Sequence, residues 1–325
     1  MVGSYQQAIA TGERALALVG DRGDVANKVT TSRQVARTYY ALGDYRQATR
    51  RHQRLVKSLT GDLLHARFDS PPIASVSARM YLAWCLGDVG RFAEGLATAE
   101  EALAIAEDAD HPLSIVNACL GLGLVHLERG DVAAATTALE RSLSVINEWD
   151  LATFFPIGAS AMGTALVMAD RAAEALPLLE RAVSAAEAGG RIEGQSIRMG
   201  ALANCYAHVG REAQAIQLGL RALALARKHH ERGREARVLR ILGELQLQKH
   251  PSQAESYFRQ GLVLAEELGM RPLAAHCHLG LAELLEPMWR GADKKNHRST
   301  ARQLYREMRM PGWLARMDQR GSGRR

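Results

Sequence analysis

The stretch RMGALANCYAHVGREAQAIQLGLRALALAR (198–227) reads as two helices joined by a tight turn. Its first half places four residues at the i, i+3, i+4, i+7 spacing of one apolar helical face: Met199, Leu202, Ala203 and Tyr206. Gly210 then interrupts the pattern, and a second apolar stripe with regularly placed small residues follows. Small residues let a neighbouring helix approach closely, so the stretch predicts a helical hairpin.

The same hairpin recurs along the chain. Its turn falls at Gly3, Gly43, Gly90, Gly130, Asp170 and Gly210, with looser equivalents near Lys249 and Gly291. The steps after Gly90 are about 40 residues long, and a fixed period in this range indicates a solenoid. One earlier step is longer, and its surplus lies in GDLLHARFDSPP (61–72), whose Gly, Asp and Pro residues indicate a loop. Asp170 replaces glycine at one turn, because Asp tolerates the left-handed conformation.

Six copies share residues at matching positions: a Leu-Gly or similar pair, an aromatic residue, the turn, and small residues on the second helix. The fullest copy has Leu202, Ala203, Tyr206, Gly210, Arg211, Ala215, Ala222 and Leu223. Over roughly residues 3–308 these copies resemble the tetratricopeptide repeat (TPR) family. The resemblance implies an all-α fold, a right-handed superhelical solenoid of about seven antiparallel helix hairpins. The usual TPR period is about 34 residues, so this chain is expected to have longer helices or connections.

The repeats run almost from end to end, so we expect one solenoid domain over 1–310 and a basic tail over 311–325. The segment GSYQQAIATGERALAL (3–18) reads as a second helix without its partner. The first hairpin is therefore expected to be incomplete, as in a truncated chain. Because terminal repeats need a polar cap, a homodimer through this helix is a further prediction.

Composition argues against secretion and membrane insertion. The N-terminus has no charged-then-apolar signal segment, and no run approaches 18 apolar residues, so we predict a cytoplasmic protein without a membrane span. The four cysteines are dispersed without a CxxC motif, each on the first helix of a hairpin. We therefore expect no disulfides.

Charge is concentrated at the C-terminus. Residues 291–325 hold ten basic and three acidic residues, a net charge of +7, so the preceding 290 residues sum to −1. The tail could contact nucleic acid or an acidic partner. Charge runs alone are weak evidence, and no aromatic interleaving or recognition-helix motif accompanies this one. A solvated capping helix is therefore the favoured interpretation, and nucleic acid is the less favoured partner.

The sequence offers no candidate catalytic residue. It contains no GxxxxGK[ST], HExxH or GxSxG motif, so we predict a protein that is not an enzyme and has no cofactor. His276 and His278 point about 200° apart on a helix and cannot bind one metal ion together with Cys277. His229 and His230 stand at a helix C-terminus, where imidazolium complements the helix dipole. We expect no metal site.

The last third carries a second resemblance. The segments GREARVLRILGEL, YFRQGLVLAEELGMRPLAAHCHLGLAELL and LYREMRMPGWLAR (233–316 overall) look like the C-terminal TPR region of large bacterial regulators with a P-loop ATPase and a nucleotide cyclase or DNA-binding module. Neither enzyme lies in this chain, so only a sensing or docking arm is implied. A basic insertion, EPMWRGADKKNH (286–297), departs from the pattern, and Pro287 should stop or kink the preceding helix.

The TPR resemblance also implies a binding surface, because the first helices of such hairpins line a concave groove. Carried over by position, the groove would contain Arg33, Gln34, Arg37, Tyr40, Met80, Tyr81, Trp84, Asn117, Ser160, Thr164, Asn204, His208, Arg237, Arg240 and Glu244. Aromatic residues suit a hydrophobic anchor, asparagines a peptide backbone and arginines a carboxylate. Alternatively, the aromatic residues pack between repeats and the arginines are solvated.

These observations give three hypotheses. The leading one is a non-catalytic protein-protein interaction scaffold that binds a peptide or partner domain in the groove. The second is the regulatory arm of a signalling ATPase, cyclase or transcriptional regulator, separated from its enzyme. The third is a nucleic-acid adaptor that acts through the basic tail.

Overall fold

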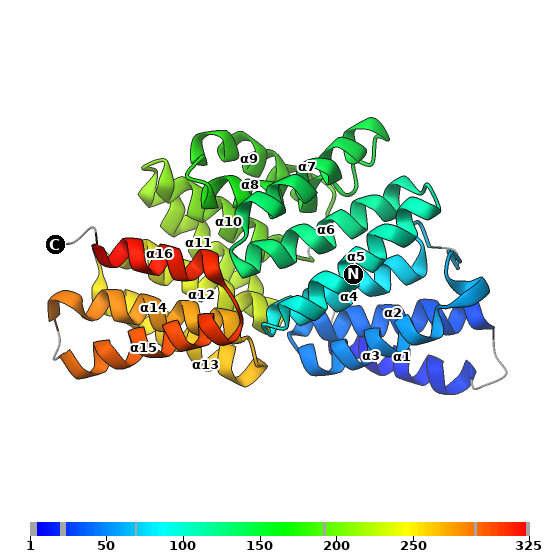
Figure 1. Cartoon of the computed structure of the whole chain (residues 1–325), viewed down its shortest axis with the longest axis horizontal. Coiled ribbons are helices and arrows are strands. Elements are labelled where there is room, and N and C mark those ends of the chain that lie inside the picture. The colour runs from blue at the N-terminus through cyan, green and yellow to red at the C-terminus, as the bar shows by residue number, and fades with distance from the viewer. Residues whose placement is uncertain (1–4, 20–23, 69, 191–192, 289–290, 323–325) are drawn as a thin grey trace.

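The computed structural model is an all-α solenoid of sequential helical hairpins (Figure 1). It describes residues 5–19, 24–68, 70–190, 193–288 and 291–322, which form sixteen α-helices and one short 3-10 helix. The helices are α1 (Tyr5–Val19), α2 (Val25–Leu42), α3 (Tyr45–Ser58), α4 (Ala74–Asp88), α5 (Phe92–Asp108), α6 (Pro112–Arg129), α7 (Val132–Glu148), α8 (Phe155–Met168), α9 (Ala172–Ala188), α10 (Gln195–His208), α11 (Glu212–Lys228), α12 (Arg232–Gln246), α13 (Pro251–Leu268), α14 (Arg271–Met288), α15 (Gly291–Glu307) and α16 (Pro311–Ser322).

The helices alternate between two layers. The even-numbered helices α2 to α14 contact one another in sequence and form the inner layer, while α3 to α15 pack outside them as the second helices of seven hairpins. α1 packs on α2 as an additional outer helix, and α16 follows the last hairpin. The predicted all-α fold of antiparallel hairpins is confirmed.

The turns within hairpins follow the sequence prediction closely. Gly43, Gly90, Gly130 and Gly210 have φ between +79° and +87°, and Asp170 has φ +59°, as a left-handed turn requires. The turn near Lys249 differs, because α13 begins there with Pro251. The first predicted turn, Gly3, lies outside the described residues.

A second series of left-handed residues joins one hairpin to the next. Asp110, Asp150, Gly190 and His230 have φ of +42°, +47°, +62° and +55°, and they also stand 40 residues apart. The sequence pattern did not reveal this series, since its members are of three residue types. Both connections of the repeat therefore reverse the chain through a single left-handed residue.

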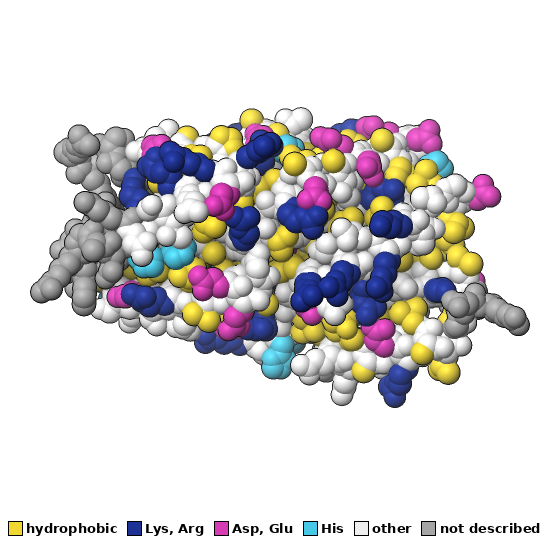
Figure 2. Space-filling view, turned by 60° about the horizontal axis from the view of Figure 1, so that its bottom comes forward, with side chains coloured by type: hydrophobic (Ala, Val, Ile, Leu, Met, Phe, Trp, Pro, Cys, Tyr) yellow, Lys and Arg dark blue, Asp and Glu magenta, His cyan; other side chains and the backbone are white. Residues whose placement is uncertain are grey.

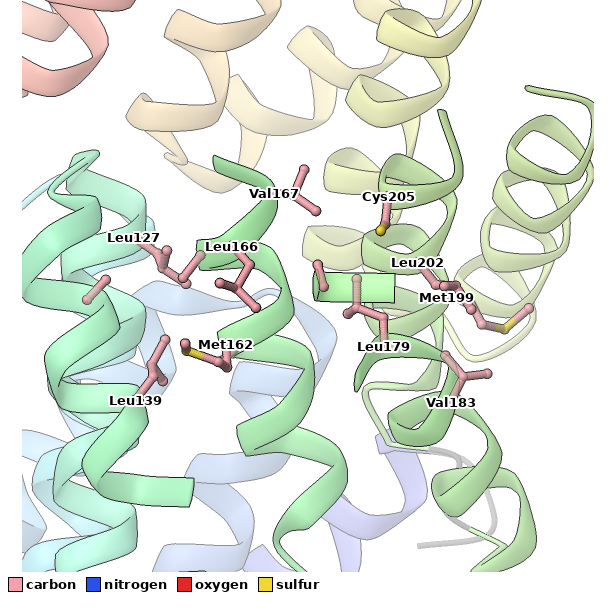
Figure 3. Close-up of a cluster of buried hydrophobic side chains, with 14 of the residues drawn as sticks. Leu127, Leu139, Met162, Leu166, Val167, Leu179, Val183, Met199, Leu202 and Cys205 are labelled. Carbon is pink, nitrogen blue, oxygen red and sulfur yellow. The ribbon is translucent and has the colours of Figure 1, made fainter. Parts of the chain in front are cut away.

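Small residues set the spacing between the two layers. Figure 3 shows the buried cluster between α6 and α10, in which Leu139 of α7 and Leu179 of α9 are fully buried. A Cβ atom added at Gly123 would lie 2.6 Å from Cγ of Leu139, and the equivalent Gly163 lies against Leu179. The first helix therefore needs glycine where the large apolar side chain of the second helix meets its backbone.

The solenoid curves until its two ends touch. α2 contacts α12, α4 contacts α14, and α6 contacts α16, so helices far apart in sequence meet along a seam. Backbone groups meet directly along this seam: a Cβ at Gly43 would lie 2.9 Å from the backbone nitrogen of Gly233. The concave face of the solenoid is therefore closed into a ring.

The C-terminal segment is part of this ring. Met310 and Met317 are fully buried, and the indole Nε1–H of Trp313 donates to the carbonyl oxygen of Glu128 at 3.1 Å. Residues 311–322 thus form a packed helix, and 323–325 lie outside the described residues. The described part of α14 runs through Pro287 to Met288, so this proline does not stop the helix at the residue before it. Within the described part of the chain, no helix has the length and apolar character needed to cross a bilayer.

Two glycines of α6 give a matched test of the layer spacing. Gly123→Ala should lower the free energy of unfolding by about 1–3 kcal/mol, because the new methyl group overlaps Leu139. Gly121→Ala should be neutral or stabilise by up to about 1 kcal/mol, because its Cβ would meet Ala99 at an ordinary 3.6 Å and alanine favours the helix. Urea denaturation followed by circular dichroism measures both, and equal effects would contradict this packing.

Candidate functional site

The inner layer surrounds one large cavity of about 940 Å³. All of the predicted groove residues line it: Arg33, Gln34, Arg37, Tyr40, Met80, Tyr81, Trp84, Asn117, Ser160, Thr164, Asn204, His208, Arg237, Arg240 and Glu244. The size suits a small-molecule or short-peptide ligand. The structure therefore brings the predicted residues together, and their role in binding stays a prediction.

Aromatic side chains form one wall of the cavity. The rings of Tyr81 and Trp84 lie 5.0 Å apart edge to face, and Tyr40 lies within 6.0 Å of both. The indole Nε1–H of Trp84 donates to the carbonyl oxygen of Leu120 at 3.3 Å, and Trp84 is only 8% exposed. Trp84 therefore packs between repeats and also lines the cavity, and its role as a binding anchor stays a prediction. Such a rigid wall suits an apolar ligand group.

Three of the predicted arginines have carboxylate partners. Arg37 pairs with Glu193 at the start of α10, and Arg240 pairs with Glu244 one turn along α12. Arg37 lowers the pKa of Glu193, although burial alone would raise it. These arginines are therefore held in place rather than freely solvated.

Arg237 joins the two ends of the solenoid. From α12 its guanidinium pairs with Asp88 at the end of α4 and with Glu128 on α6, with Nη1 2.5 Å from Glu128 Oε1. Burial raises the pKa of Asp88 to about 6, against the opposing effect of Arg237. Oδ2 of Asp88 has no hydrogen-bond partner within the structure. The cluster therefore buries one carboxylate oxygen that has no hydrogen-bond partner among the described residues.

Two asparagines face the cavity with unused amides. Asn117 of α6 is 3% exposed, and Asn204 of α10 is partly buried. Among the described residues neither side chain has a hydrogen-bond partner, whereas the Thr164 hydroxyl donates to the carbonyl oxygen of Ser160 at 2.9 Å. An amide presents both a donor and an acceptor, so it can pair with a peptide group of a ligand.

Some cavity residues escaped the sequence analysis. Asp88, Glu128, Trp313 and Arg316 line the cavity, the last two from α16. Arg316 donates to the carbonyl oxygen of Met168 and lies 5.6 Å from the Trp313 ring centroid. The repeat pattern could not place Trp313 and Arg316, because α16 lies outside the repeat and reaches the cavity only through closure of the ring. Asp88 and Glu128 stand near the C-terminal ends of α4 and α6, beyond the positions that the TPR resemblance assigns to the groove.

Three basic residues of the C-terminal segment, Arg298, Arg302 and Arg316, have partners within the described structure. Arg302 pairs with Asp318, and Arg298 donates to the carbonyl oxygen of Met317 at 2.8 Å. Arg306 and Arg309 are exposed and have no ion pair among the described residues, and four more exposed cations without ion pairs follow one face of α3: Arg46, Arg50, Arg54 and Lys57. On the face that Figure 2 shows, basic, acidic and apolar side chains are mixed. Exposed basic side chains therefore occur on α3 as well as in the C-terminal segment.

The described residues contain no group of three or more His, Cys, Asp or Glu side chains that could hold a metal ion. All four cysteines are buried and free. His276 Nδ1 lies 2.7 Å from the Tyr305 hydroxyl, whereas His278 Nδ1 lies 2.7 Å from His297 Nδ1, so the two histidines of α14 face different neighbours.

A buried histidine beside the cavity gives a pH-dependent prediction. His52 of α3 is fully buried, stacks on Tyr81 at 5.4 Å, and has no partner at either ring nitrogen. Burial, with help from Arg33, lowers the pKa of His52 from 6.5 to about 3. His52 is therefore protonated in the unfolded chain at pH values where it stays neutral in the folded chain. The free energy of unfolding consequently falls as the pH falls from about 6.5 towards 3.

The variant His52→Phe should remove this acid-dependent loss while keeping a flat ring on Tyr81. Urea midpoints measured between pH 7 and pH 4 should fall less steeply for the variant than for the parent protein. His208→Gln, which removes an exposed histidine, should leave the slope unchanged. If the urea midpoint of His52→Phe falls with pH as steeply as that of the parent protein, the assignment to His52 is wrong.

Comparison with known proteins supports the fold alone. No protein-family profile and no curated protein sequence matches the chain. Among solved structures, the Rap conjugation gene regulator of plasmid pLS20 in complex with the Phr* peptide is 12% identical, with a TM-score of 0.66 over 93% of this chain and 83% of that one. A Rap protein complexed with Competence and Sporulation Factor is 13% identical, with a TM-score of 0.61 over 99% and 95%.

The aspartyl phosphate phosphatase F of Bacillus subtilis is more distant, at 12% identity and a TM-score of 0.53 over 90% of this chain and 73% of that one. The TM-scores of all three comparisons indicate a shared overall fold. The fold of this chain is therefore that of the TPR-like Rap proteins.

Proposed function

We propose that this chain is a non-catalytic receptor that binds a short linear peptide in its central cavity. The observation that carries the proposal is the convergence of unused amides and a rigid aromatic wall on one cavity. Asn117 and Asn204 supply peptide-like donors and acceptors, and Tyr81 and Trp84 supply an apolar surface. A ligand with both apolar groups and a hydrogen-bonding backbone matches this lining.

The structural neighbours support the same class of ligand. One Rap protein was solved with the Phr* peptide, and another with Competence and Sporulation Factor. The ring also resembles a phosphatase, yet the cavity groups described here are held in ion pairs and aromatic contacts rather than arranged around a nucleophile and its base. Peptide binding is therefore the function that the cavity supports best.

A cavity-filling substitution tests the proposal without removing core contacts. Thr164→Trp places an indole inside the cavity from α8 and should abolish retention of peptides from a random hexapeptide pool in equilibrium dialysis with mass spectrometry. The matched control is Thr137→Trp on the exposed face of α7, where the hydroxyl makes the same bond to the carbonyl four residues earlier.

The parent protein and Thr137→Trp should retain the same few sequences, with dissociation constants in the range of about 1 nM to 1 µM. If Thr164→Trp retains those peptides as well, they bind elsewhere. If the parent protein retains none, the peptide-receptor proposal fails.

A further inference from the structure

Arg33 differs from the other arginines of the predicted groove. Its guanidinium lines the cavity from α2, and its only hydrogen bond to the described residues is from Nη1 to the Ser70 hydroxyl oxygen at 2.6 Å. Arg37, Arg237 and Arg240 each have a carboxylate partner. Among the described residues no carboxylate pairs with Arg33. Within the described structure, the cavity wall therefore carries a half-buried cation without an ion-pair partner.

The surroundings of Arg33 strengthen this excess of positive charge. Burial and the neighbouring Arg37 lower the pKa of Arg33, yet an arginine stays protonated in proteins. His52 on the adjacent α3 is buried, and its low pKa keeps it neutral. The carboxylate of Glu193 pairs with Arg37 and not with Arg33. A half-buried cation is costly unless an anion approaches it, so this corner of the cavity favours an anionic group.

Ser70 supplies a second donor at the same corner. The residue is 5% exposed and lines the cavity, and its hydroxyl accepts from Arg33. A hydroxyl that accepts one bond keeps its own hydrogen to donate. The described structure gives that hydrogen no acceptor, so it is free to reach an oxygen atom placed beside the guanidinium.

The extra loop of the longest repeat holds Ser70 in this position. This loop, within 59–73, contacts α2, where the hydroxyl of Thr30 donates to the carbonyl oxygen of Phe68 at 3.2 Å. On its far side, the backbone N–H of Ile73 donates to the hydroxyl of Ser114 on α6 at 3.0 Å. The insertion that interrupts the 40-residue period thus brings a fixed polar group to the cavity.

We propose that Arg33 and Ser70 form a subsite for a carboxylate of the bound peptide. The remaining guanidinium N–H groups and the Ser70 hydroxyl donate to the two carboxylate oxygens, an arrangement for which the planar arginine fork is suited. Every unmodified linear peptide ends in a carboxylate, and Asp or Glu side chains offer the same group. This inference rests on the proposed peptide-receptor function and assigns the ligand's charge and one point of attachment.

The test uses two random pools of N-acetylated hexapeptides that differ only at the C-terminus, one ending in a carboxylate and the other in a carboxamide. The full-length chain selects peptides from each pool by equilibrium dialysis. The strongest binder is then made as the acid, as the amide, and with each Asp or Glu replaced by Asn or Gln. Isothermal titration calorimetry compares these peptides on the parent protein and on the variants Arg33→Gln, Ser70→Ala and Arg54→Gln.

We expect loss of the carboxylate to raise the parent Kd by about tenfold or more. Arg33→Gln should raise the Kd of the acid by a similar factor and should no longer distinguish the acid from its neutral form. Ser70→Ala should have a smaller effect in the same direction. Arg54→Gln removes an exposed arginine outside the cavity and should change nothing. If Arg33→Gln does not fold, Arg33→Lys keeps the charge without the fork and should weaken the preference for the acid.

The outcomes separate the two proposals. Loss on amidation assigns the terminal carboxylate, and loss on a side-chain replacement assigns Asp or Glu; both support the subsite. Peptides that bind equally well without any carboxylate overturn the subsite and leave the receptor function standing. Retention of no peptide from either pool overturns the receptor function and the subsite with it.

Discussion

The ion cluster around Arg237 is the contact on which the shape of this molecule depends. Burying a charge is costly, and Arg237 is stabilised only because Asp88 and Glu128, 149 and 109 residues away in sequence, meet it from two other helices. The same seam buries Glu231, which accepts from Tyr5 at 3.0 Å. Closure therefore converts the open concave face of a solenoid into a cavity whose walls come from both ends of the chain.

Local rules explain why the repeats could be predicted. A left-handed turn favours glycine or aspartate, so the turns at Gly130, Asp170 and Gly210 could be identified from residue type. The second series of turns was missed because residues as different as Asp150 and His230 occupy the same conformation, where the packing of the repeat imposes it. Periodicity thus predicts a turn when the residue type is restricted, and fails when tertiary packing overrides local preference.

The candidate site was predictable where the position of a residue in the repeat determines the direction in which its side chain points. Residues such as Asn117 and Thr164 occupy inward positions of first helices, and all of the inward positions reached one cavity. Asp88, Trp313 and Ser70 were missed for a different reason: each joins the cavity through a contact between distant segments or through a loop outside the repeat. A repeat pattern describes neighbours along the solenoid, and it carries no information about contacts across the ring.

A double-mutant cycle between Asp88 and Arg237 tests the closed ring most directly. Urea unfolding of the parent protein, Asp88→Asn, Arg237→Gln and the double variant yields the coupling free energy of the two side chains. Contact across the seam predicts a coupling of about 1–3 kcal/mol, with no coupling between Asp88 and Arg240, which pairs within its own helix. A coupling below about 0.3 kcal/mol for Asp88 and Arg237 would show that the ends do not meet in solution.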